Sequence, residues 1–324
     1  MRRWLWRWLA AVAVTLAGVF ALGPYEPVVV DVRFDPARLE GGVDAYFTAE
    51  EAAVPGIRAG AEKRVVWAGP VGETTPLAIV YFHGFSASSQ EIRPVPDRVA
   101  TELGANLIYT RFTGHGRDGA ALAEATVRDW MEDAAEALEV ARAVGRKVIV
   151  IATSTGGSIA AAAAAQPDLA RDVAGVVLVS PNFGIRHGMA PLLTLPAARH
   201  WLPLVAGARR SFEPLNEAQA RHWTTAYPSE AVFPMAAIVK HAAGLDHAAI
   251  GVPALFYFSE ADKVVDAVQT VRVMEGWGGP VVRAAPDLAE GDDPMAHVIA
   301  GDIMSPSVTD SAVEVIVDWV RGLH

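Results

Sequence analysis

The chain has 324 residues, of which 52% are hydrophobic and 20% charged, and this composition excludes a wholly disordered protein. Its 27 basic and 37 acidic residues give a net charge of −10, so the protein would repel phosphate backbones and no nucleic-acid partner is expected. The sequence has no cysteine, which excludes disulfides, thiolate nucleophiles and cysteine-ligated metals.

Residues 1–23 have the composition of a membrane-directed segment. Three arginines among the first seven residues precede an uncharged run from Trp8 to Gly23. The run suits a signal peptide, and counting back to Trp4 makes it just long enough to span a bilayer. We favour an uncleaved inner-membrane anchor through residues 4–22, with the rest of the chain outside the cytoplasm, because Pro24 is a poor residue after a cleavage site. Cleavage would instead give a periplasmic or secreted protein.

From about Val65, short apolar runs alternate with longer helical patterns, which predicts an α/β fold with a mostly parallel central sheet flanked by helices. Strands are expected at 63–68, 77–82, 106–110, 147–152, 175–180, 254–259 and 280–283, with one more at 28–33 in the entry segment. Helices are expected at 91–103, 127–144, 157–165, 264–277 and 308–322. Thr126 is expected to cap the second helix.

The interval between the strands at 175–180 and 254–259 is too long for an ordinary connection, so it is expected to carry structure of its own. Its many prolines would divide it into short helices. We therefore predict a core formed by residues 24–182 and 251–324, and a helical cap at 183–250 inserted after the sixth expected strand. The apolar residues of the cap would line a pocket or form the cap's own core.

A cluster of small residues follows the strand at 147–152 and leads directly into a helix. It reads ATSTGGS over residues 152–158. Small residues permit a sharp turn from strand to helix, on which the Ser154 hydroxyl would project above the sheet as a nucleophile. Ser158 is less favoured because it falls a full turn into the helix. The alternative is that the cluster is only a helix cap and turn.

This cluster resembles the nucleophile elbow, G-x-S-x-G, of the α/β-hydrolase superfamily, with Ala152 in place of the first glycine. The sequence His83-Gly84-Phe85-Ser86, after the strand at 77–82, resembles the H-G-x loop of the same superfamily. The resemblance implies that the backbone N–H groups of Phe85 and Thr155 form the oxyanion hole. His83 is expected to be structural rather than catalytic.

The sequence FTGHGR at 112–117 and the pair Asp129-Trp130 resemble the serine esterase and lysophospholipase branch of the superfamily, which is monoacylglycerol lipase-like. His115, within the first of these motifs, is expected to brace its loop. The branch implies a carboxylesterase or a monoacylglycerol/lysophospholipid-type lipase that acts on a small-molecule ester or lipid. Alternatives on the same fold are a thioesterase, a peptidase, a C–C hydrolase or a non-catalytic binding protein.

A seryl hydroxyl needs a histidine to accept its proton and a carboxylate to orient that histidine, and this fold supplies them in the order Ser, acid, His. Asp262 follows the strand at 254–259 in a D-x-V-V pattern, with Glu260 and Asp266 as less favoured candidates. His297 is the histidine between the last strand and the last helix. The implied catalytic residues are therefore Ser154, Asp262 and His297.

Cofactors and metals are not expected. Several acidic residues surround His297 in the sequence, but neither a calcium-loop motif nor H-E-x-x-H is present, so a solvated acidic loop is favoured over a metal site. The residues are Asp287, Glu290, Asp292, Asp293 and Asp302. No glycine-rich phosphate-binding loop follows a strand, and water suffices as the second substrate.

Overall fold

The centre of the protein is a seven-stranded sheet, parallel throughout except for its first strand, which is antiparallel to its neighbour. The computed structural model describes residues 2–323, without the side chains of Arg2, Arg3, Leu5 and Leu16. In spatial order the strands are β1 (Arg64–Val66), β3 (Asn106–Tyr109), β2 (Thr75–Phe82), β4 (Gly145–Thr153), β5 (Val173–Val179), β8 (Ala254–Tyr257) and β9 (Val281–Ala284).

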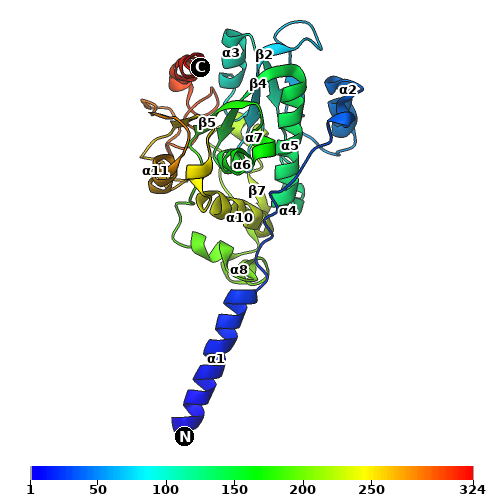
Figure 1. Cartoon of the computed structure of the whole chain (residues 1–324). Helices are drawn as coiled ribbons and strands as arrows, with labels where there is room; N and C mark the ends of the chain where they lie inside the picture. Colours follow the sequence, from blue (N-terminus) through cyan, green and yellow to red (C-terminus); the bar gives the residue numbers. More distant parts are fainter. Residues whose placement is uncertain (1, 324) are drawn as a thin grey trace.

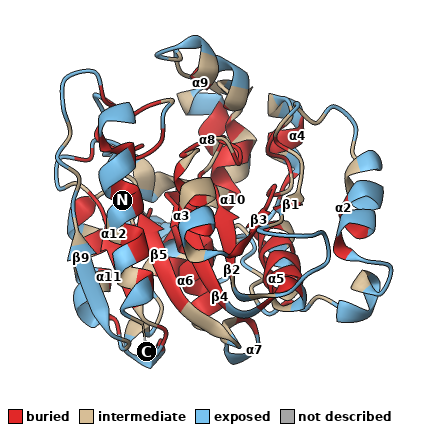
Figure 2. Ribbon diagram, turned by 90° about the horizontal axis from the view of Figure 1, so that it is seen from above, coloured by how far each residue is buried: buried red, intermediate tan, exposed pale blue. Residues whose placement is uncertain are grey.

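Helices cover both faces of this sheet (Figure 2). On one face lie α3 (Val95–Leu103) and α12 (Thr309–Arg321), and on the other lie α5 (Val127–Val144), α6 (Thr155–Ala164) and α11 (Ala267–Gly276). Successive residues of β2 enter the two apolar clusters in turn. Because both faces are buried, the central strands are apolar along their length, and these apolar runs are the pattern from which the strands are predicted.

Local signals fix the helix boundaries. Thr126 and Asp129 form a capping box at the start of α5, as the sequence predicts. By contrast, α3 begins at Val95 rather than at residue 91. Residues 84–92 form consecutive turns, and Pro94 occupies the N-cap position. Two short helices complete the core: α4 (Gly119–Glu124) and α7 (Pro167–Ala170).

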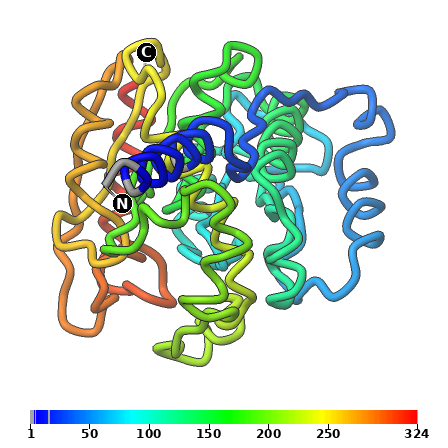
Figure 3. Tube along the Cα trace, turned by 90° about the horizontal axis from the view of Figure 1, so that it is seen from below, coloured from blue at the N-terminus to red at the C-terminus, as the bar shows by residue number. Residues whose placement is uncertain are grey.

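The strand predicted at 28–33 is wrong. The segment belongs to no strand, although Val32 is buried and Val30 packs against the cluster that contains α5. Its run of valines therefore reflects packing against the core rather than a strand ladder. The chain continues through a 3₁₀ turn (Pro36–Leu39) to α2 (Val43–Ala52), which lies outside α5 (Figure 3). Consequently the inserted cap follows the fifth strand, not the sixth.

The segment between β5 and β8 contains more than short helices. Its helices are α8 (Ala198–Ala206), α9 (Glu217–His222) and α10 (Val232–Ala243), with 3₁₀ turns at Ala190–Thr194, Ser229–Ala231 and His247–Ala249. It also contains a two-stranded antiparallel sheet, β6 (Arg209–Ser211) and β7 (Ala226–Pro228). Leu202 and Phe233 belong to a small apolar cluster within it, so part of its apolar content is its own core.

The first helix, α1 (Arg2–Leu22), stands away from the body and meets it beside α8 (Figure 1). The apolar side chains of α1 that the structure describes are exposed, and Leu22 has 89% of its surface accessible. At its base the Pro24 carbonyl accepts a 2.7 Å hydrogen bond from Ala197 N–H, and Glu26 forms an ion pair with Arg199. No helix of the described residues combines the length and apolar character needed to cross a membrane.

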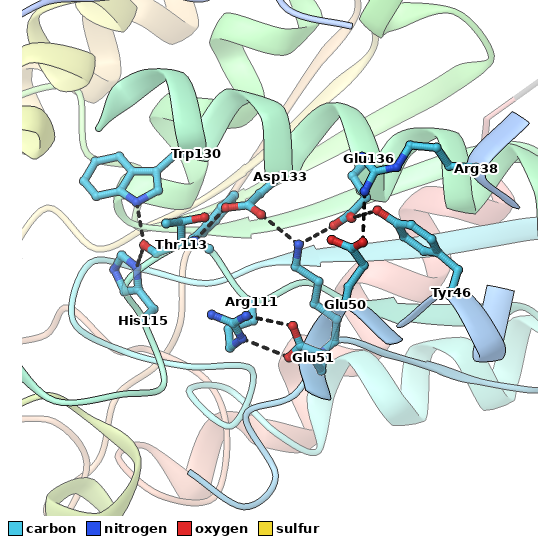
Figure 4. Close-up of polar contacts among 12 residues, drawn as sticks. Arg38, Tyr46, Glu50, Glu51, Arg111, Thr113, His115, Trp130, Asp133 and Glu136 are labelled. Carbon is cyan, nitrogen blue, oxygen red and sulfur yellow. Dashed lines mark hydrogen bonds and ion pairs between the residues drawn. The ribbon is translucent and has the colours of Figure 1, made fainter. Parts of the chain in front are cut away.

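A buried polar cluster holds the N-terminal segment to α5 (Figure 4). The Lys63 ammonium lies 2.8 Å from Asp133 Oδ1 and also contacts Glu136, which in turn accepts a hydrogen bond from the Tyr46 hydroxyl. Burial lowers the pKa of Lys63, but the two carboxylates raise it by a larger amount, so the net shift is upward. Lys63 therefore stays charged with only 9% of its side chain exposed.

Replacing Lys63 by methionine is expected to destabilise the protein by about 3–5 kcal/mol, because it leaves two buried carboxylates without their cation. Lys147→Met is the matched control. Lys147 pairs with Asp172 at 2.9 Å, but its side chain is 57% exposed, and such pairs contribute about 0–1 kcal/mol. Urea unfolding of both variants measures the difference. Equal losses in the two variants would contradict the assignment of a stabilising role to the buried cluster.

Candidate active site

Ser154 lies at the sharp turn between β4 and α6. Its backbone has φ +53° and ψ −120°, a conformation that non-glycine residues rarely adopt, and its N–H donates to the Val179 carbonyl at 2.9 Å. Ser154 occupies the N-cap position of α6, but its side chain makes no capping hydrogen bond, so helix capping does not account for the serine hydroxyl. The turn therefore presents the hydroxyl to other groups.

The small residues around Ser154 are required by close packing. A Cβ on Gly156 would lie 2.3 Å from the Phe82 carbonyl oxygen, a distance that no side chain tolerates. Ala152, at the position where the superfamily motif has glycine, is fully buried in β4 and pairs in register with Leu178. An alanine methyl is thus accommodated there without changing the turn.

Three side chains from different loops meet at this turn. The His297 Nε2 atom lies 3.0 Å from Ser154 Oγ, and His297 Nδ1 lies 2.8 Å from Asp262 Oδ2. The other carboxylate oxygen, Asp262 Oδ1, accepts hydrogen bonds from the N–H groups of Val264 and Val265 at 2.8 and 2.9 Å. The structure therefore places the three sequence-predicted residues in one continuous hydrogen-bonded chain.

The other two candidate carboxylates have different partners. Glu260 is 68% exposed and forms an ion pair with Arg283. Asp266 caps α11 by accepting a hydrogen bond from Val268 N–H at 3.0 Å. Neither one hydrogen-bonds to His297.

The environment of His297 shifts its basicity. Burial lowers the pKa of His297, but the hydrogen bond and charge of Asp262, together with the charges of Glu91 and Asp293, raise it more. The net effect places the pKa above the ordinary value of 6.5. The imidazole is consequently a stronger base than a free histidine.

We expect hydrolytic activity to increase with pH through a midpoint above 6.5. Only neutral His297 can accept the Ser154 proton, and the raised pKa keeps the imidazole protonated to a higher pH than usual. The measurement is kcat/KM as a function of pH from about 4 to 9. Full activity maintained down to about pH 5 would show that His297 is not the base.

The loop after β2 lies against the same turn. A Cβ on Gly84 would be 3.2 Å from Ser154 Cβ, so the backbone of this loop approaches the serine closely. Within the part of the chain that the structure describes, the N–H groups of Phe85 and Thr155 donate to no protein acceptor. Both are therefore available for a developing oxyanion.

Two histidines brace this region. His83 Nδ1 lies 2.9 Å from the Gly84 carbonyl oxygen, and its Nε2 accepts the Phe112 N–H at 3.2 Å. Burial lowers the pKa of His83 to about 4, so the ring is neutral and donates from Nδ1. His115 packs its ring 5.8 Å from that of Phe85 and contacts the Thr113 carbonyl. Neither histidine hydrogen-bonds to Ser154, which agrees with structural roles.

A cavity of about 530 Å³ contains Ser154 and His297. The cap contributes much of its wall, and the lining is mainly apolar. The apolar lining residues include Phe85, Ile185, Phe212, Leu215, Trp223, Tyr227, Met235, Val264, Met295, Val298 and Met304. Its acidic lining residues are Glu91, Glu213 and Asp293.

The sequence motifs mark none of these three acidic residues as part of the site. Asp293 Oδ2 accepts hydrogen bonds from the N–H groups of His297 and Val298 at 3.1 and 2.8 Å, and so holds the histidine loop. Glu91 is buried beside Gly84. The sequence predicts a solvated loop for Asp293, which is wrong because this residue is buried, and no motif marks Glu91. Their partners are backbone groups, which a sequence pattern does not reveal.

Two other acidic residues near His297 in the sequence, Asp292 and Asp302, hold neighbouring loops by hydrogen bonds. Asp292 is buried and accepts hydrogen bonds from Ala289 N–H and from Ser307. Asp302 accepts a hydrogen bond from the Thr309 hydroxyl at 3.1 Å. These contacts connect the histidine loop to the start of α12.

Several solved structures share this fold. One of the metagenome-derived lipolytic enzymes LipS and LipT aligns with a TM-score of 0.66 and 19% identity, over 82% of this chain and 99% of that one. The monoacylglycerol lipase of Paleococcus ferrophilus aligns with a TM-score of 0.57 and 14% identity, over 81% of this chain and 98% of that one. A soluble variant of the Saccharomyces cerevisiae monoglyceride lipase aligns with a TM-score of 0.57 and 11% identity, over 80% of this chain and 90% of that one. No curated protein sequence matches the chain.

The family model described as serine aminopeptidase, S33 (Hydrolase_4) matches residues 74–284, from β2 to the end of β9. That range includes the Ser154 turn, the loop of Gly84 and the Asp262 loop. Because the match covers well over half of the sequence, the chain belongs to the S33 serine aminopeptidase (Hydrolase_4) family of α/β-hydrolases.

Proposed function

We propose that the protein is a serine hydrolase that cleaves carboxylic esters of lipophilic acyl groups. The observation that carries this proposal is the hydrogen-bonded chain from Ser154 through His297 to Asp262 at a mainly apolar cavity of about 530 Å³. The nucleophile and base are within hydrogen-bond reach, and the base is oriented by a carboxylate. The likeness in fold to lipolytic enzymes agrees with this chemistry.

In the proposed mechanism, Ser154 Oγ attacks the ester carbonyl carbon while His297 Nε2 takes its proton. The oxyanion accepts hydrogen bonds from the Phe85 and Thr155 N–H groups. His297 then returns the proton to the departing alkoxide, which leaves as an alcohol and produces an acyl-enzyme on Ser154. Water, deprotonated by His297, attacks that ester and releases the carboxylic acid. Asp262 holds the Nδ1–H of His297 throughout.

Ester hydrolysis is favoured over cleavage of the first peptide bond at the amino terminus of a peptide, which is the activity that the family description names. An aminopeptidase needs an anionic group to bind the substrate ammonium. Of the acidic residues in the cavity, Asp293 accepts hydrogen bonds from backbone N–H groups, and Glu91 keeps one oxygen free of the described residues but is only 3% exposed. Glu213 lies at the apolar wall formed by Phe212 and Leu215. The aliphatic and aromatic lining suits an acyl chain better than a charged terminus.

The test is hydrolysis of p-nitrophenyl esters from acetate to palmitate by the full chain in detergent, alongside aminoacyl p-nitroanilides. We expect ester turnover, with an optimum chain length that reports the depth of the cavity. Labelling by a fluorophosphonate probe shows whether Ser154 is activated. Nitroanilide cleavage without ester cleavage would replace the esterase by a peptidase, and absence of both turnover and labelling would favour a non-catalytic binding protein.

We further propose that the protein acts outside the cytoplasm and associates with a membrane through residues 4–22. Support comes from the order of the segment, with its arginines first and its apolar residues second, and from the exposure of the apolar side chains of α1. Flotation with anionic lipid vesicles tests the association. We expect the full chain to float and a chain lacking residues 1–23 to sediment; equal behaviour of the two would contradict the proposal.

A further inference from the structure

A buried carboxylate lies beside the loop of Gly84 and Phe85, and the mechanism above assigns it no role. Glu91 is only 3% exposed, and its Oε2 atom accepts a hydrogen bond from the Gly84 N–H at 2.7 Å. Gly84 immediately precedes Phe85, whose N–H is one of the two proposed oxyanion donors. The carboxylate therefore holds the peptide unit next to the one that would bind the oxyanion.

The same oxygen connects this loop to the nucleophile turn. The Tyr81 hydroxyl donates to Glu91 Oε2 at 3.0 Å and lies 3.1 Å from Thr153 Oγ1. Since Tyr81 has one hydroxyl proton and donates it to Glu91, Thr153 donates to Tyr81. Thr153 immediately precedes Ser154, and both Tyr81 and Thr153 are fully buried. A continuous chain of hydrogen bonds thus joins the residue before the nucleophile to the residue before Phe85.

The second oxygen of Glu91 is open to the substrate cavity. Among the described residues none donates a hydrogen bond to Oε1, and Glu91 lines the cavity that contains Ser154 and His297. A Cβ on Gly84 would meet this oxygen at 2.7 Å and Ser154 Cβ at 3.2 Å, so the carboxylate lies close to the serine. Its charge therefore acts on the same small volume in which the proton transfers would occur.

We propose that Glu91 is a positioning residue that fixes the Phe85 N–H relative to Ser154, and that its negative charge stabilises protonated His297. This inference rests on the proposed roles of Ser154, His297 and Phe85. It predicts two separable effects of Glu91: hydrogen bonding determines the rate at high pH, and charge determines where the rate falls as the pH decreases.

The charged surroundings make the second effect measurable. Asp262, Asp293 and Glu91 are the carboxylates that act on His297, and no ion pair to a lysine or arginine neutralises Glu91 among residues 2–323. Burial raises the pKa of Glu91 to about 6, although its hydrogen bonds to Gly84 and Tyr81 oppose the shift. The charge of His297 in turn lowers the pKa of Glu91, so the charge state of each group affects the titration of the other.

The test uses fluorophosphonate labelling rates and p-nitrophenyl ester kinetics of the full chain from about pH 5 to 9. Glu91→Gln keeps an oxygen that can accept from Gly84 and Tyr81 but removes the charge. We expect a rate at high pH within about threefold of wild type, and an acid limb moved to lower pH by roughly half a unit or more. An unchanged acid limb in this variant would overturn the role of the charge.

Glu91→Ala removes the hydrogen bonds as well. We expect kcat and the labelling rate to fall about 10²–10³-fold with KM unchanged, the loss typical of a misplaced oxyanion donor. Should this variant fail to fold, Tyr81→Phe removes the hydroxyl that links Glu91 to Thr153 but keeps the hydrogen bond between Glu91 and Gly84, and a roughly tenfold decrease is expected. Wild-type rates in the variants that fold would overturn the positioning role.

Glu102 on α3 is the matched control, because its exposed side chain lies in no part of the site; Glu102→Gln and Glu102→Ala should leave both profiles unchanged. Wild-type protein serves as the reference for the proposed function. If wild type neither labels nor hydrolyses esters, the proposed function fails and this inference fails with it. If wild type is active and the Glu91 and Tyr81 variants match it, only the inference about Glu91 fails.

Discussion

Replacing Ser154 by alanine is expected to lower kcat for ester hydrolysis by about 10⁶-fold, because it removes the proposed nucleophile and leaves only binding and the oxyanion donors. The protein should fold as before. Alanine adopts the same φ of +53° no less readily than serine, and the lost hydroxyl contacts only His297. Steady-state kinetics, with urea unfolding as the check on folding, measures both expectations.

Ser158→Ala is the matched control for this variant. Ser158 lies in α6, one turn beyond Ser154, is also buried, and donates its hydroxyl proton to the Asn182 carbonyl instead of contacting His297. We expect it to retain activity within about tenfold while losing about 1 kcal/mol of stability from the missing hydrogen bond. Substantial ester turnover by Ser154→Ala, with Ser158→Ala as the impaired variant, would move the nucleophile to residue 158.

The second large effect is expected for Asp262→Asn, at about 10⁴-fold in kcat. The amide carries no charge to stabilise the imidazolium, and its NH₂ group can favour the wrong tautomer of His297. The backbone around residue 262 should be preserved, because the amide oxygen can still accept from the N–H groups of Val264 and Val265. Kinetics above the pKa of His297 measures the loss.

Asp266→Asn applies the same chemical change four residues later. Asp266 only caps α11, so we expect a small loss of stability and a kcat within about twofold of wild type. A wild-type kcat for Asp262→Asn would mean that the hydrogen bond to His297 can be provided without a charge, and the proposed role of Asp262 would be abandoned.

The sequence placed Ser154, Asp262 and His297 through their order between strands, and the structure brings these three side chains together. This was possible because parallel strands end at one edge of the sheet, so that residues far apart in the chain meet there. Apolar runs identified those strands. The boundary of α5 was equally predictable, since Thr126 and Asp129 form a local signal.

Other features depended on contacts that local patterns do not contain. Residues 28–33 form an apolar, β-type run, but Val30 and Val32 pack against the core without a strand partner, so residue type alone gave the wrong element there. Strands β6 and β7 have three residues each, too few for a periodic signal. Glu91 accepts a hydrogen bond from the backbone N–H of Gly84. An acidic residue at another position in the chain could make the same contact, so no sequence spacing identifies it.

The junction between α1 and the body determines how a mechanical load would travel through the molecule. The backbone at Pro24 is bonded to Ala197, and Glu26 is paired with Arg199, so residues just after α1 are fastened to the cap rather than to the sheet. Tension applied at the amino-terminal end would therefore reach α8 before it reached Val30 and the core. Under a pulling force, the wall of the cap would be strained first and the central strands last.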